Sequence, residues 1–151
     1  MPGLFYFSIG MFDIHHNFVV NSTSQKVFEA FCTSPGLDSW WTLQSEGKPE
    51  IVNIYTFNFG PEYDWRAEVI HLVPGRELTW KMVQTMDDWK NTKVGFQLKE
   101  KDGITHVHFF HLGWAEASEH FGITTYCWGQ LLHGLKKYIE EGIIIPHAQR
   151  N

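Results

Sequence analysis

Segment 104–114 carries the side chains best suited to chemistry, among them His106, His108 and His111. The ordinary pKa of histidine lies near neutrality, so the ring can act as a general acid or base, or can orient a ligand carbonyl or hydroxyl group. Side chains alternate along a strand, so His111 faces away from the other two. Among these three histidines we take His111 as the only candidate for a catalytic role. The alternative is a buried neutral histidine bonded to a backbone carbonyl or a helix side chain.

His106 and His108 form a His-x-His pair whose spacing suits two metal ligands. Zinc needs a third and usually a fourth ligand, and the sequence supplies no nearby Cys or Glu. His15 and His16 would point to opposite faces of a strand and make a weaker pair. We therefore expect solvent-facing histidines, no metal site and no other cofactor.

Other reactive groups lack the arrangement that catalysis needs. The acid pairs Asp87-Asp88 and Glu140-Glu141 are interpreted as solvated charge at element ends. No Gly-x-Ser-x-Gly elbow or paired Cys and His is present. We expect no catalysis.

Aromatic residues are numerous, with seven Trp, twelve Phe and five Tyr in 151 residues. Large rings supply buried area and also line apolar pockets. For a single ring, filling the core is the simpler interpretation. For the whole set, a cavity left between imperfectly packed rings is as well supported as a filled core.

The element that must position these side chains is a long helix predicted over 116–142. Gly142 follows its last apolar residue, where a left-handed cap is expected. Gly129 and Gly134 inside the helix each cost about 1 kcal/mol relative to Ala, so packing must hold it in place. The spacings of four, three, four, three and four residues define an apolar stripe of Phe121, Thr125, Trp128, Leu132, Leu135 and Ile139.

The chain before this helix predicts a sheet. Two short helices, 27–32 and 36–41, follow the first strand, and Asp102-Gly103 is a strong hairpin signal. We predict an α+β fold, with an antiparallel sheet of about six strands curled around the helix and a pocket in any space left between them. The expected strands are 12–20, 51–59, 65–73, 77–83, 92–100 and 104–114.

The totals favour one domain over 11–151, with 1–10 as a weakly ordered extension and Met11 as an alternative start. The net charge of −5 and the absence of a basic run argue against nucleic acid or a membrane surface as partners. No apolar run reaches the roughly 20 residues that span a bilayer. Reduced Cys32 and Cys127 and the lack of a signal peptide lead us to expect a cytoplasmic protein.

Four motifs resemble those of the START-like (SRPBCC, birch-pollen-allergen-like) superfamily. Residues 105–114 (THVHFFHLGW) resemble its last-strand pattern, Thr-x-Val-x-Leu-x-His-x-Gly-aromatic. Residues 34–41 (SPGLDSWW) resemble its short-helix motif, and 128–135 (WGQLLHGL) its closing-helix motif. Residues 20–28 (VNSTSQKVF) resemble the entry into its first helix. The combination is most similar to the branch homologous to the activator of the large heat-shock chaperone ATPase (AHSA-type).

The resemblance implies a helix-grip fold, often with a hydrophobic cavity, and a family that mostly binds lipid-like or other apolar molecules. It also implies that Thr105, Val107, Phe109 and His111 face inward. The related chaperone activators carry a separate N-terminal domain for which this chain has no room, so we do not expect a chaperone partner. A homodimer remains open.

We therefore predict a non-enzymatic module that binds a small apolar or amphipathic molecule between sheet and helix. His111, with Tyr55 or Tyr63, would orient it. The alternatives are a cyclase or hydrolase using His111 as acid and base, and a protein-interaction domain. The predicted ligand-binding residues are Trp40, Trp41, Tyr55, Phe57, Phe59, Trp65, Trp80, Phe96, Val107, Phe109, His111, Trp128 and Leu132.

Overall fold

The long C-terminal helix α3 (Glu119–Glu141) has well-defined ends in the computed structural model, which describes residues 12–150. The Ser118 side chain accepts a hydrogen bond from the backbone N–H of Phe121 at its start. Gly142 caps its end in the left-handed conformation, with a φ of 71°. The predicted helix and its glycine cap are confirmed.

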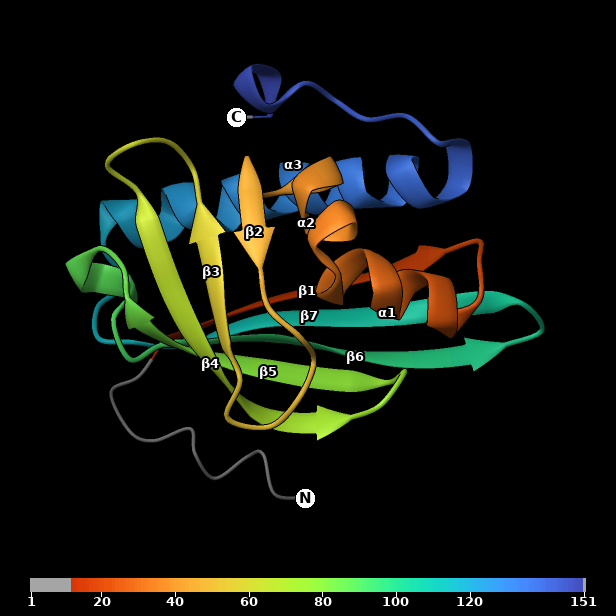
Figure 1. Cartoon of the computed structure of the whole chain (residues 1–151), viewed down its shortest axis with the longest axis horizontal. Helices are drawn as coiled ribbons and strands as arrows, with labels where there is room; N and C mark the ends of the chain where they lie inside the picture. The colour runs from red at the N-terminus through yellow and green to blue at the C-terminus, as the bar shows by residue number, and fades with distance from the viewer. Residues whose placement is uncertain (1–11, 151) are drawn as a thin grey trace.

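The rest of the chain forms a seven-stranded antiparallel sheet that curves around α3 (Figure 1). The strand order is β1-β7-β6-β5-β4-β3-β2, so the first and last strands of the chain's sheet are neighbours at one edge. Two short helices, α1 (Ser24–Cys32) and α2 (Ser34–Trp40), connect β1 to β2. The strands are β1 (Phe12–Val20), β2 (Gln44–Glu46), β3 (Ile54–Asn58), β4 (Asp64–Val73), β5 (Glu77–Gln84), β6 (Lys93–Lys101) and β7 (Ile104–Trp114).

This architecture confirms the predicted α+β helix-grip fold. Strand β2 was not predicted from the sequence. This strand is three residues long and only its central Ser45 is buried, so it has no alternation of apolar residues. The strand expected from residue 51 begins at Ile54, because Val52 has a φ of 62°, which places it in a turn. The predicted N-terminal extension, 1–10, lies outside the described residues.

Aromatic side chains fill the space between the sheet and the helices. Phe31 of α1 stacks on Phe96 of β6, with ring centroids 4.1 Å apart. Trp41 lies between Phe57 of β3 and Trp128 of α3, at centroid distances of 4.7 and 5.1 Å. These ring contacts connect the helices α1 and α3 to strands of the sheet.

The junction between α1 and α2 depends on a glycine. The Thr33 hydroxyl donates to the Glu29 carbonyl and accepts from the Gly36 N–H, so one side chain joins both helices. A Cβ at Gly36 would lie 2.5 Å from the Glu29 oxygen and 2.7 Å from the Ala30 Cα. Only glycine allows the two helices to approach this closely.

We expect Gly36→Ala to lower the free energy of unfolding by about 1–3 kcal/mol, because the new methyl group meets backbone that cannot move aside. The matched control is Gly122→Ala in α3, where a Cβ meets no atom within 4 Å. That change should raise the free energy of unfolding by up to about 1 kcal/mol through helix propensity. Urea denaturation followed by circular dichroism measures both. Equal effects of the two changes would contradict the close-approach argument.

Candidate ligand-binding site

His111 lies buried between the sheet and α3, with both ring nitrogens hydrogen-bonded. Its Nδ1 accepts from the Trp128 Nε1–H at 3.1 Å, and its Nε2 lies 2.9 Å from the Thr92 hydroxyl. The Thr92 hydroxyl donates to the Trp89 carbonyl, so it must accept the proton of His111 Nε2. Because Nδ1 accepts a hydrogen bond and Nε2 donates one, the His111 ring carries a single N–H proton and is neutral.

Burial, followed by the charge of His120, lowers the pKa of His111 to about 3. The ring is neutral at physiological pH and has no free nitrogen toward solvent. This geometry differs from the expectation that His111 meets an open cavity. It matches the alternative of a neutral histidine bonded to a helix side chain, and a role toward ligand stays a prediction.

The structure brings most of the predicted ligand-binding residues together as a packed core. Tyr55 donates its hydroxyl proton to the Cys32 carbonyl at 2.7 Å, whereas Tyr63 is exposed. Phe59 and Trp65 are partly buried against the core. Those fully inside are Trp40, Trp41, Tyr55, Phe57, Trp80, Phe96, Val107, Phe109, His111, Trp128 and Leu132.

Three buried indoles remain without a hydrogen-bond acceptor among the described residues: those of Trp80, Trp89 and Trp114. A buried donor left unpaired costs about 1–3 kcal/mol. These N–H groups are therefore the interior positions where an acceptor on a ligand would gain most.

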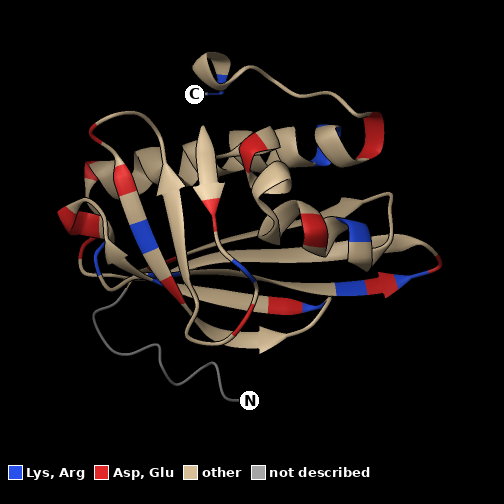
Figure 2. Ribbon diagram, viewed as in Figure 1, with Lys and Arg blue, Asp and Glu red and all other residues tan. Residues whose placement is uncertain are grey.

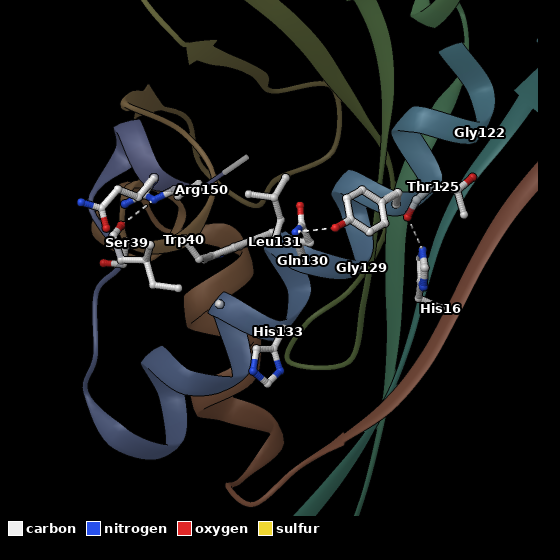
Figure 3. Close-up of a pocket in the computed structure, with 14 residues that line it drawn as sticks. His16, Ser39, Trp40, Gly122, Thr125, Gly129, Gln130, Leu131, His133 and Arg150 are labelled. Atoms are coloured by element: carbon white, nitrogen blue, oxygen red, sulfur yellow. Dashed lines mark hydrogen bonds between the residues drawn. The ribbon is translucent and has the colours of Figure 1, made fainter. Parts of the chain in front are cut away.

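An open groove of about 780 Å³ runs along α3, from His16 of β1 at one end to Arg150 of the C-terminal segment at the other (Figure 3). Pockets of 300–1,000 Å³ are typical of small-molecule sites. Among the predicted residues, only Trp40 lies on its wall. The wall consists of His16, Ser39, Trp40, Gly122, Thr125, Tyr126, Gly129, Gln130, Leu131, His133, Gly134, Ile145, Gln149 and Arg150.

Glycines leave the helical wall of this groove bare. Gly122, Tyr126, Gly129 and His133 recur at spacings of four, three and four, which places them on one face of α3. A Cβ at Gly122 would meet no atom within 4 Å, and one at Gly129 would lie 3.7 Å from His16 Cε1. Close packing does not require these glycines, although each weakens the helix by about 1 kcal/mol. They keep the space open.

The exposed face of α3 is also uncharged. Between Glu119 and Lys136 the helix has no Lys, Arg, Asp or Glu, and Figure 2 shows its charged residues gathered toward its ends. Ile123 and Tyr126 are 51% and 67% exposed beside the groove. An outward helical face normally carries charge, so this apolar surface is typical of a binding region.

Polar groups occur at the two ends of the groove. The His16 Nε2–H donates to the Thr125 carbonyl at 3.1 Å. At the other end Arg150 donates to the carbonyls of Ile145, Thr42 and Asp38 at 2.8, 3.1 and 2.9 Å. These bonds hold the C-terminal segment against α2 and so build the second wall.

The histidines on the outer sheet face pair with each other. His15 Nδ1 lies 2.9 Å from His108 Nε2 and the rings stack, while His106 is exposed. Burial, and then the charge of His15, lower the pKa of His108. Within residues 12–150 no group of three or more His, Cys, Asp or Glu side chains is placed to hold a metal ion. In the same range, no helix has the length and apolarity needed to cross a membrane.

Sequence reasoning missed the groove because its walls come from distant segments. The one local signal of the groove is the pair Gly129 and Gly134 in α3. From the sequence alone, we interpret their cost in helix stability as one that packing must offset. The return of the C-terminal segment to α2 has no local sequence signal.

Comparison with known proteins gives a family and several similar folds. The family described as Activator of Hsp90 ATPase homolog 1-like protein matches residues 21–140. The solution structure of the Aha1 dimer from Colwellia psychrerythraea is 26% identical, with a TM-score of 0.78, over 87% of this chain and 98% of that one. A protein from Staphylococcus saprophyticus is 18% identical, with a TM-score of 0.76, over 89% and 96% of the two chains. No curated protein matches the sequence.

Acid should destabilise the fold through His111. The unfolded chain binds a proton with the ordinary pKa of 6.5, whereas the folded ring does so only near 3. The stabilising contribution is therefore complete above pH 6.5 and is lost between pH 6.5 and 3, at up to about 1.4 kcal/mol per pH unit. Urea titrations should show a smaller gap between wild type and His111→Gln at pH 4.5 than at pH 7. A constant gap would contradict the buried neutral histidine.

Proposed function

Because the chain belongs to the Activator of Hsp90 ATPase homolog 1-like family, we propose that it uses this scaffold as a binding module for a small, largely apolar molecule. The ligand lies in the groove on the outer face of α3. The observation that carries this proposal is the bare helical wall at Gly122 and Gly129, which no packing contact explains.

The exposed surface of the groove wall is mainly apolar. Trp40, Leu131 and Ile145 are among its apolar wall residues. Burial of apolar surface contributes about 25 cal/mol per Å², from which the ordering of ligand and side chains must be subtracted. The few polar groups at the ends would set the orientation.

The packed interior favours the groove as the binding site over the space between sheet and helix, where the sequence predicts the ligand. Trp41, Phe57, Phe109 and Trp128 occupy that space in mutual contact. A ligand there would have to displace rings that already stabilise the fold. Catalysis by His111 is not part of the proposal, because both of its nitrogens are hydrogen-bonded inside the core.

Self-association is a second candidate, favoured by two exposed apolar side chains, Tyr126 on the groove wall and Ile123 next to Gly122 of that wall. The similar protein from Colwellia psychrerythraea is described as a dimer. Light scattering after size exclusion would report a dimer that Tyr126→Glu dissociates, if this face associates. A monomer at all concentrations would eliminate this candidate without affecting the ligand proposal.

Filling the groove should weaken binding without destabilising the fold. We expect Gly129→Leu to weaken binding of the neutral apolar dye Nile red at least about tenfold, which corresponds to about 1.4 kcal/mol. The free energy of unfolding should stay the same or rise, because leucine favours the helix. Fluorescence titration measures the affinity, and urea denaturation measures the stability.

The matched control is Glu141→Leu, which adds the same side chain at an exposed position of α3 outside the groove. It should bind Nile red as wild type does. Unchanged affinity in Gly129→Leu, or an equal loss in both variants, would contradict the groove as the site.

A further inference from the structure

The guanidinium of Arg150 is a buried cation at the end of the groove that the C-terminal segment forms. Arg150 lies on the groove wall, and only 9% of the residue is exposed. Its Nε and two terminal nitrogens each donate to one backbone carbonyl. A guanidinium has five N–H donors, so two remain beyond these bonds with the described residues.

The charge of Arg150 is only partly offset, because the Asp38 carboxylate acts on it without forming an ion pair. In the described part of the chain, no carboxylate forms an ion pair with it within 4.0 Å. Burial lowers the pKa of Arg150 and the more distant Asp38 carboxylate opposes this, but an arginine stays protonated in a protein. The Asp38 carboxylate already accepts hydrogen bonds from the hydroxyls of Thr42 and Ser45.

The described wall of the groove carries no carboxylate side chain. No Asp or Glu is among its wall residues, although the chain carries a net charge of −5. With its histidines neutral, Arg150 carries the only formal charge among the described wall residues. A cationic ligand would bring like charges together in a partly buried site, whereas an anion would supply the missing counter-charge.

We propose that the ligand of the groove is an amphipathic carboxylate, with its carboxylate on Arg150 and its apolar body along Gly134, Gly129 and Gly122. This assignment rests on the proposed function. A carboxylate presents two coplanar oxygens, which match parallel N–H donors of a guanidinium in the strongest form of charge-assisted hydrogen bond. Gly122 and Gly134 lie twelve residues apart, about 18 Å along the helix axis, which is long enough for an extended alkyl chain.

The test compares dodecanoate with dodecan-1-ol, which shares the alkyl chain but lacks the charge. Isothermal titration calorimetry, below the micellar concentrations, measures both affinities in wild type and in Arg150→Met. Wild type should bind dodecanoate at least about tenfold more tightly than dodecanol, because a charge-assisted hydrogen bond is added. Arg150→Met should bring the ratio of the two affinities close to one. The control Arg66→Met removes an exposed arginine on β4 and should keep the wild-type ratio.

Each outcome is decisive. Equal affinities in wild type, or a ratio unchanged in Arg150→Met, would overturn the carboxylate while leaving an apolar binding module intact. If neither compound binds wild type, the proposed function fails as well. Should Arg150→Met not fold, the side-chain Nε–H resonance of Arg150 in wild type decides: it should shift with dodecanoate and not with dodecanol. No shift would overturn the proposal.

Discussion

The hydrogen bond between Trp128 and His111 is the contact on which the arrangement of α3 depends. It joins the middle of the helix to β7. His111 is hydrogen-bonded in turn to the Thr92 hydroxyl, which donates to the backbone carbonyl of Trp89. Trp41, Phe109 and Trp89 surround the same indole. With Trp128 fixed inward, the opposite face of α3 must point away from the sheet. The groove is a direct consequence of this orientation.

Two faces of one helix therefore serve different purposes. The inner face gains stability from large apolar rings, and this offsets the cost of glycines on the outer face. The outer face gives up helix propensity and charge to leave an open apolar wall. Arg150 completes the groove by binding the C-terminal segment to the carbonyls of Asp38 in α2 and of Thr42, two residues beyond α2. Binding is thus placed outside a closed core.

The fold was predictable because its signals are local and periodic. The stripe around Trp128 predicted α3, alternation predicted the longer strands, and the motif at 105–114 predicted the family. Strand β2 was not predictable, because pairing with β3 creates it and its own residues lack alternation. The position of Arg150 depends on partners 108 and 112 residues away, which no local pattern reveals. His111 was recognised as the distinctive polar group, but its two bonds to Trp128 and Thr92 could come only from the structure.

The central claim is that a ligand binds on the outer face of α3 and leaves the core closed. A proton–nitrogen NMR titration of the wild-type protein with dodecanoate tests it most directly, since indole and glycine signals report both locations. We expect shifts at the amides of Gly122, Gly129 and Gly134 and at the Trp40 indole. The buried, unpaired indoles of Trp80, Trp89 and Trp114 should not move. Dominant shifts at those three indoles would place the ligand between sheet and helix and contradict the account.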